Sequence, residues 1–366
     1  MAMAAALTHE RLTRGHQVAA ALAASWRVTP AAWEPSRPEL GAVNPLLLRS
    51  GAGALAWRRL RTGAAARSPA GFELQQAYRL HAIQSLLHER QLARVLNRLR
   101  GAGVEPLLGK GWAVARHYPE AGLRPYGDFD LYVGSAQREA ARAVLEGDDA
   151  AVDLHTGCAE LNDRPWSLLN ERARSLPLGG GQVRVFGAED HLRLLALHML
   201  RHGAWRPLWL CDLGAVLETS GRGFDWGLLL SGDQRRTDWV CCALVLAREL
   251  VGANLDGAPE QVTRRALPAW LHRTVLRQWA DAGFEAQGRR RPMVSYAQRP
   301  AGVLRALRSR WPNAIEATVG VRGPFNGLPR LPFQLAECVS RTARFTLGLP
   351  RALARASPLT GFARAR

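Results

Sequence analysis

The sequence has almost no lysine. The 366-residue chain carries 49 basic residues, and only Lys110 among them is a lysine. An ammonium group is a compact point charge, whereas a guanidinium is planar and forked, so a lysine kept in such a chain suits a phosphate or a narrow pocket. The alternative is that this lysine survived by chance, and its position in the fold distinguishes the two.

Patterns for disulfides, zinc, secretion and membrane spans are also missing. The five cysteines are odd in number and never adopt CxxC spacing, which indicates free thiols in a reducing compartment. No apolar run approaches the roughly 20 residues that a membrane span needs. The alanine-rich start lacks a basic region followed by an apolar stretch and a cleavage site. We therefore expect a cytoplasmic protein without a transmembrane segment.

Acidic residues are scarce near the end of the sequence. Residues 288–366 contain fifteen arginines against Glu316 and Glu337, in a chain whose net charge is +18. This segment favours a polyanionic partner such as nucleic acid, an acidic membrane surface or a phosphorylated substrate. Aromatic residues for base stacking are few here, so composition alone does not favour RNA. A solvated surface in an arginine-rich protein is the alternative.

Hydrophobic periodicity predicts a small sheet between helical regions. It indicates a long helix over residues 72–100, closed by Gly101 and Gly103. The predicted strands are 104–108, 128–133, 152–155 and 182–186, and the predicted later helices are 189–202, 207–219, 225–231 and 237–251. The expected fold is a small mixed-sheet α/β (α+β) core embedded in mostly helical N- and C-terminal regions. We expect four regions: 1–100 helical, 101–188 the α/β core, 189–285 helical and 286–366 basic and rich in proline and arginine.

Acidic residues gather on two of the predicted strands. Side chains alternate along a strand, so Asp128 and Asp130 share one face, and Asp153 and His155 share a face of the next strand. If these strands pair, three carboxylates converge. Hard divalent ions such as Mg²⁺ take oxygen ligands of this kind, and phosphate completes their coordination. The alternative is an ordinary surface strand with solvated acids.

A Gly-Lys-Gly turn precedes these strands. Gly109, Lys110 and Gly111 link a predicted strand to a helix, where backbone N–H groups favour an anion. The turn is not a Walker A loop, because Gly103 to Gly109 is one residue too long and Gly111 replaces the magnesium-binding Ser or Thr. The lysine turn followed by Asp-x-Asp is a rarer combination than either motif alone.

Together these motifs resemble a known family. Residues 107–119 (LLGKGWAVARHYP) and 122–133 (GLRPYGDFDLYV) are similar to an uncharacterised bacterial nucleotidyltransferase family of the DNA polymerase β-like superfamily. The shared pattern is an apolar strand, Lys-Gly, a helix ending near Tyr-Pro, and Arg before Asp-x-Asp. The resemblance continues through residues 152–155, 189–192, 197–203 and 209–212, and covers about 75 to 255.

The resemblance implies a core that binds a nucleoside triphosphate (NTP) and Mg²⁺. Asp128 and Asp130 would hold metal and triphosphate, and Asp153 would activate the acceptor hydroxyl in a two-metal mechanism. Lys110, Gly111 and Arg124 would contact the phosphates.

Two departures from the family pattern bear on Asp153. The segment between Val133 and Val152 is shorter than expected, and Thr156 stands where an aromatic residue is usual.

The helical matches suggest supporting roles. His198 and His202 lie one turn apart without the third ligand that a zinc site needs, so core hydrogen bonding or lining the substrate cleft is expected. Asp212 is predicted to be a buried hydrogen-bond partner, and Asp225 the N-cap of the helix starting at Trp226.

The sequence therefore predicts an Mg²⁺-dependent nucleotidyltransferase that moves a nucleoside monophosphate (NMP) from an NTP to an acceptor. The acceptor could be a small molecule, a peptide or protein, or an RNA end. Because members of the resembling family often accompany biosynthetic gene sets, a natural-product or peptide acceptor is consistent with the resemblance. The alternatives are a catalytically silent relative that binds nucleotides or polyanions as an assembly module, and a toxin-like enzyme acting on tRNA through residues 288–366. Base, acceptor and oligomeric state stay open.

Overall fold

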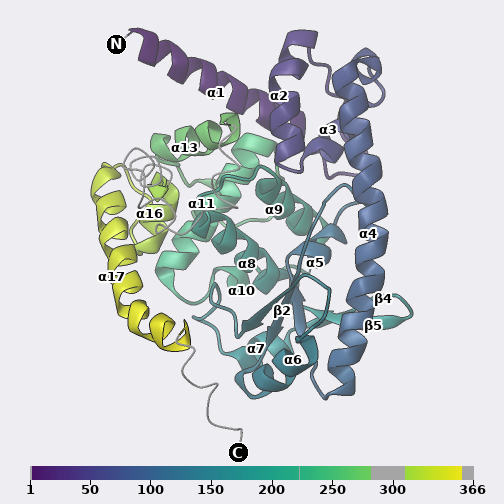
Figure 1. Ribbon diagram of the computed structural model, residues 1–366. Helices are drawn as coiled ribbons and strands as arrows, with labels where there is room; N and C mark the ends of the chain where they lie inside the picture. Colours follow the sequence, from purple (N-terminus) through teal and green to yellow (C-terminus); the bar gives the residue numbers. More distant parts are fainter. Residues whose placement is uncertain (1, 222, 282–309, 357–366) are drawn as a thin grey trace, which may run out of the picture.

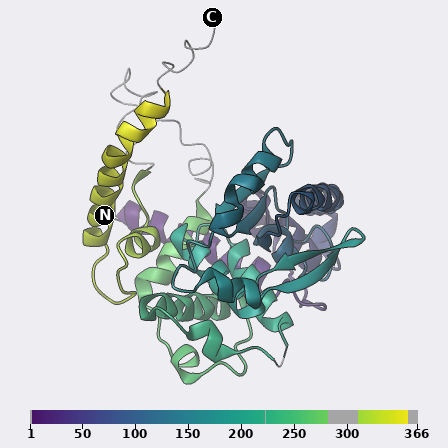
Figure 2. The same ribbon diagram turned by 90° about the horizontal axis from the view of Figure 1, so that it is seen from below.

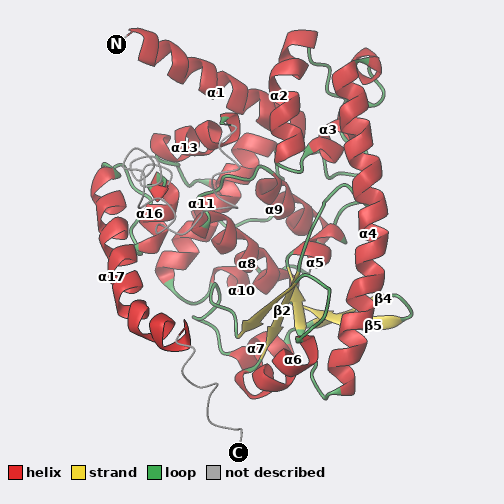
Figure 3. Cartoon of the chain, viewed as in Figure 1, coloured by secondary structure: helices red, strands yellow, loops and turns green. Residues whose placement is uncertain are grey.

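Over the residues that the structure describes, the chain folds into a mostly helical body with one mixed sheet. The computed structural model describes residues 2–221, 223–281 and 310–356. Figure 3 shows the strands gathered in one part of the molecule with helices around them, as the predicted fold class requires. The helices are α1 (Ala2–Leu22), α2 (Arg37–Arg49), α3 (Gly53–Leu60), α4 (Pro69–Gly101), α5 (Gly111–Ala115), α6 (Arg138–Leu145), α7 (Trp166–Glu171), α8 (Ala188–Arg201), α9 (Leu208–Thr219), α10 (Trp226–Leu230), α11 (Gln234–Val251), α12 (Glu260–Thr263), α13 (Ala269–Ala280), α16 (Ala314–Gly320) and α17 (Leu331–Ala356).

The sheet has five strands in the order β3-β2-β1-β5-β4. They are β1 (Leu107–Gly109), β2 (Phe129–Val133), β3 (Val152–Thr156), β4 (Arg174–Leu178) and β5 (Gly181–Val185). β1 runs antiparallel to β2 and parallel to β5, while β2 and β3 are parallel. The four predicted strands are present. The prediction missed β4, an edge strand whose Pro177 lacks the amide that a central strand needs.

The register of β2, an interior strand of the sheet, places Asp130 between two neighbouring strands. Asp130 is paired with Gly109 of β1 on one side and with Asp153 of β3 on the other. The pairing of the two acidic strands is thus confirmed. The short connection between them, which contains α6, still brings Asp153 opposite Asp130.

The two faces of β2 pack against different helices. Phe129, Leu131 and Val133 are buried in a hydrophobic cluster with one end of α4. Tyr132 on the opposite face packs edge-on against Phe186, in the larger cluster that also contains α8. The sheet is therefore held between α4 and α8, and Figure 1 shows α4 running along its side.

A glycine ends α4 and directs the chain into β1. Gly103 has φ of +72°, its amide donates to the carbonyl of Arg100, and the Val104 amide donates to the carbonyl of Leu99. This is the Schellman arrangement, which needs a left-handed residue just past the helix. The predicted helix end is confirmed, with Gly103 as the residue that adopts the left-handed conformation.

The predicted helices after residue 188 are present as α8, α9, α10 and α11. Asp225 is the N-cap of α10, accepting a hydrogen bond from the Leu228 amide, as predicted. One hydrophobic cluster joins the N-terminal helices, the sheet and helices α8 to α13. The four-region division stays a prediction, and residues 286–309 and 357–366 of its last region lie outside the described residues.

The five cysteines are free, as expected. Within the described ranges, no helix combines the length and apolar character that crossing a membrane requires. Figure 2, turned by 90°, shows α17 (yellow) on the opposite side of the molecule from the β4–β5 hairpin.

Candidate active site

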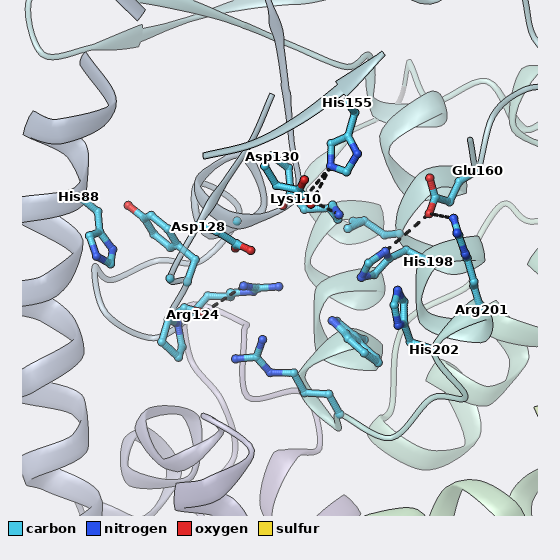
Figure 4. A pocket seen from close by; sticks show the side chains of 18 of the residues that line it. His88, Lys110, Arg124, Asp128, Asp130, His155, Glu160, His198, Arg201 and His202 are labelled. Atoms are coloured by element: carbon cyan, nitrogen blue, oxygen red, sulfur yellow. Dashed lines mark hydrogen bonds and ion pairs between the residues drawn. The ribbon is translucent and has the colours of Figure 1, made fainter. Parts of the chain in front are cut away.

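A cavity of about 730 Å³ lies where the sheet meets α8 and the start of α9. All six sequence-predicted site residues line it: Lys110, Gly111, Arg124, Asp128, Asp130 and Asp153. Figure 4 shows Asp128, Asp130 and His155 on one side and a group of Glu160, His198, Arg201 and His202 on another. α4 supplies a third side through Gln84 and His88.

The Gly109–Gly111 turn brings the single lysine to the acids. Lys110 has φ of +49°, a left-handed conformation uncommon for a residue with a side chain, and its Nζ lies 2.5 Å from Asp130 Oδ1. Gly111 also has positive φ, and a Cβ there would lie 3.2 Å from the Asp128 carbonyl oxygen. The turn therefore fits closely against the Asp-x-Asp segment, which favours a role for Lys110 over its survival by chance.

Asp130, Asp153 and His155 form a compact cluster. His155 Nε2 lies 3.2 Å from both Asp130 Oδ1 and Asp153 Oδ2, and one ligand atom from each of the three residues falls within 4.8 Å of the others. The His155 ring stacks on Tyr132 at 4.5 Å. Asp130 is buried, whereas the Asp153 side chain is 57% exposed. Asp153 therefore faces the open part of the cavity.

The two acids of the Asp-x-Asp motif differ in their electrostatics. Burial alone would raise the pKa of Asp130, but the hydrogen bond with His155 and the Lys110 ammonium lower it. Asp128, just before β2, has neither a hydrogen bond nor an ion pair to its carboxylate from the described residues. Desolvation in the pocket wall and the nearby Asp130 raise the pKa of Asp128. Asp130 therefore has partners for its charge, whereas the Asp128 carboxylate has none among the described residues.

Arg124 is held from behind by a buried carboxylate. Its Nη2 donates to Asp212 Oδ2 at 2.8 Å, its Nε donates to Oδ1 at 3.1 Å, and its Nη1 donates to the Pro125 carbonyl. Tyr118 Oη also donates to Asp212. Burial opposes the charge on Arg124, but Asp212 outweighs it and raises the pKa. Asp212 is the predicted buried partner, while phosphate binding by Arg124 stays a prediction.

The helical side of the cavity is built from α8, α9 and the segment before α7. Glu160 Oε1 accepts a 3.0 Å hydrogen bond from Arg201 and lies 3.8 Å from His198 Nδ1. The His198 and His202 rings are 4.4 Å apart. Burial lowers the pKa of both histidines, that of His202 to about 4, so both imidazoles are neutral at pH 7. The expectation that they line a cleft is confirmed.

Sequence reasoning gave no role to five lining residues with acidic or basic side chains: His88, His155, Glu160, Arg201 and Arg206. His155 had a usable signal, because it is two residues after Asp153 and so shares its strand face. Glu160 and Arg206 had none, since both lie in irregular segments between elements that only the tertiary fold brings together.

A mixed sheet that groups carboxylates and a lysine at one cavity is typical of metal-assisted phosphoryl and nucleotidyl transfer enzymes. The family model described as "uncharacterised nucleotidyltransferase" matches residues 45–157 and 146–252. These ranges span more than half of the chain, so the protein belongs to this nucleotidyltransferase family, as the sequence resemblance indicated. No curated protein and no solved structure matches the chain. Membership of the polymerase β-like superfamily stays a prediction.

The carboxylates at this site fit a hard divalent cation. Lys110 and His155 both contact Asp130 through Oδ1, and His155 contacts Asp153 through Oδ2. Asp130 Oδ2, Asp153 Oδ1 and the Asp128 carboxylate therefore keep oxygens that no described side chain takes. Magnesium prefers oxygen ligands of this kind and completes its shell with water and phosphate.

Proposed function

We propose that the protein transfers an NMP group from an NTP to an acceptor, with Mg²⁺ as the metal. The observation that carries the proposal is the convergence of Asp128, Asp130 and Asp153 with Lys110 on one cavity. The nucleotidyltransferase family of the chain supports it.

Each residue has a distinct part in this proposal. Asp128 and Asp130 hold the metal, with Asp153 as the third carboxylate of a two-metal site. The metal, when bound, would neutralise charge on the phosphates. The amide of Gly111 and the ammonium of Lys110 face the phosphates, and the charge of Arg124 lies behind them.

The reaction is a substitution at the α-phosphorus. The acceptor oxygen forms a new P–O bond there, while the bond from that phosphorus to the bridging oxygen breaks and pyrophosphate leaves. Asp153 accepts the acceptor proton. Its carboxylate is 57% exposed and lines the cavity, so an acceptor can reach it.

The acceptor is a hydroxyl or phosphate on a small molecule, a peptide or protein, or an RNA end. A natural-product or peptide acceptor is consistent with the family resemblance, and a nucleic-acid partner would bind through residues 288–366. A catalytically silent relative is the main alternative. Its premise was that the short segment after β2 keeps Asp153 away, and the pairing of Asp153 with Asp130 weighs against that premise.

The test incubates purified protein with each α-labelled NTP, Mg²⁺ and a cell extract that supplies acceptors. Asp128→Asn is the matched variant, because the Asp128 carboxylate forms no hydrogen bond or ion pair with the described residues whose loss would disturb the fold. We expect label on one extract component with wild type, and at least 1,000-fold less (on the order of the metal's contribution to such reactions) with the variant.

The outcomes separate the alternatives. Nuclease or protease sensitivity of the labelled component gives the acceptor class. NTP binding without transfer to any fraction of the extract favours the silent relative. Equal transfer by wild type and Asp128→Asn contradicts the assigned site.

A further inference from the structure

Arg206 reaches the cavity from the loop between α8 and α9 and was assigned no role by the motifs. Its Nε donates a 3.0 Å hydrogen bond to the carbonyl of Ser50, between α2 and α3. Within residues 2–221, 223–281 and 310–356, no carboxylate forms an ion pair with it. Arg206 therefore lines the cavity without a carboxylate counter-ion from these residues.

The turn between α2 and α3 holds this guanidinium in place. A Cβ at Gly51 would lie 2.9 Å from Arg206 Nη2, and Gly51 has φ of +74°, which glycine adopts without strain. The hydrogen bond to Ser50 and the space left by Gly51 fix the side chain in place. Such fixed placement is expected for an arginine that is preorganised for a ligand.

The other basic residues of the cavity are already paired. Lys110 contacts Asp130, Arg124 contacts Asp212, and Arg201 contacts Glu160. Holding a guanidinium in a partly desolvated place without a carboxylate costs free energy. Burial, with a smaller effect from Arg124, lowers the pKa of Arg206 to about 10, so the residue stays charged at neutral pH.

Among the described residues, Arg206 is thus the cavity arginine without an ion pair, and Asp128 is the cavity acid without one. They are close enough for the Asp128 charge to affect Arg206, but they form no ion pair. An anionic acceptor would satisfy only Arg206, and a bare cation only Asp128. A metal-bound polyphosphate satisfies both at once, because its metal meets the carboxylate and its phosphate oxygens meet the guanidinium.

We propose that Arg206 binds the β- and γ-phosphates of the nucleotide, so that the phosphate site combines the sheet, the α8–α9 loop and the α2–α3 turn. This inference rests on the proposed function and assigns the leaving group of that reaction to a specific side chain. Because the guanidinium is forked, it can donate two hydrogen bonds to one phosphate.

The test measures equilibrium binding of NTP and of NMP, each with Mg²⁺, to wild type and to Arg206→Ala. We expect the Kd for NTP to rise roughly 10- to 100-fold, the range of lost charge-assisted hydrogen bonds, and the Kd for NMP to stay within about twofold. Inorganic pyrophosphate should compete with NTP on wild type and lose that competition on the variant. Arg264→Ala removes the same charge from an exposed pair with Glu260 outside the cavity and should change neither Kd.

Two further variants keep the proposal falsifiable if Arg206→Ala unfolds. Arg206→Lys keeps the charge but loses the fork, and Gly51→Ala keeps the arginine but displaces it. Each should weaken NTP binding more than NMP binding, with melting temperature recorded alongside.

Unchanged NTP binding in folded Arg206 variants overturns the proposal. So does an equal loss of affinity for NTP and NMP. If the wild-type protein binds no NTP, the proposed function itself is contradicted. The wild-type titration shows this before any variant is compared.

Discussion

The two sides of the cavity are built on different principles. We call Lys110, Asp128, Asp130, Asp153 and His155 the sheet wall, and Glu160, His198, Arg201, His202 and Trp209 the helical wall. The sheet wall concentrates carboxylates and leaves Asp128 unpaired. On the helical wall the acid is paired and the imidazoles are neutral. Under the proposed function, this difference assigns the chemistry to the sheet wall and the shape of the cavity to the helical wall.

One buried ion pair connects the two walls. Arg124 lies in the segment before β2, and Asp212 is on α9 with no exposed surface. This contact and the hydrophobic cluster around it hold the two walls in place, and removing the contact is the most direct way to break the comparison.

The largest expected effect on stability follows from Asp212→Asn. The substitution leaves the Arg124 guanidinium buried without a counter-ion, and removing one partner of such a pair costs about 3–5 kcal/mol. Urea unfolding of wild type and variant measures the loss. Glu139→Gln, an 81% exposed carboxylate on α6, is the matched control and should change stability by less than about 0.5 kcal/mol.

If Asp212→Asn lost as little free energy of unfolding as Glu139→Gln, apolar packing alone would hold the two walls in place. NTP binding by the folded fraction of Asp212→Asn adds a second readout, because a displaced Arg124 should weaken it even where the protein stays folded.

Sequence reasoning reached the sheet wall because strands impose a local rule. Alternation along β2 and β3 placed Asp128 with Asp130 and Asp153 with His155, and parallel pairing then needed only that the two strands be neighbours. The ends of the helices were also accessible, since the caps at Gly103 and Asp225 depend on a few adjacent residues.

His198 and His202 were accessible through their one-turn spacing on a helix, but the rest of the helical wall and the neighbouring Arg206 follow no local rule. Glu160 reaches Arg201 across 41 residues of sequence, and Arg206 reaches Ser50 across 156. Side chains in irregular segments carry no periodicity from which their direction could be predicted. Arg124 was found by its motif, but its buried partner Asp212 is 88 residues away and was predicted only as a generic hydrogen-bond partner.

A smaller effect is expected from Glu160→Gln on the helical wall. Arg201 is 58% exposed, so solvent screens the lost pair, and we expect a stability loss of about 1 kcal/mol at pH 7. Burial acts to raise the pKa of Glu160, but His198 and Arg201 together lower it from 4.5 to about 2. The contribution is therefore present above pH 4.5 and is lost as pH falls toward 2.

Unfolding curves of both proteins between pH 7 and 3.5 test this sign. The gap between them should be constant down to about pH 4.5 and shrink below it. A gap that widens in acid contradicts the assignment. The NMP transfer rate of Glu160→Gln is a second test. If it were lower than that of Asp128→Asn, the chemistry would belong to the helical wall, and the comparison would fail.

The smallest effect has the opposite sign and lies on the sheet wall. Asp128 has its pKa raised above 3.8 by desolvation and by Asp130, so its charge opposes folding at neutral pH. Asp128→Asn should therefore stabilise the protein, by less than about 1 kcal/mol because the cavity is open to solvent. The gain is present above the folded pKa and disappears below pH 3.8. Asp130→Asn should instead destabilise, since it leaves Lys110 without its partner. Opposite shifts in melting temperature for the two variants would indicate that Asp128 serves a ligand and not the stability of the fold. Equal decreases in melting temperature would indicate that both acids are structural.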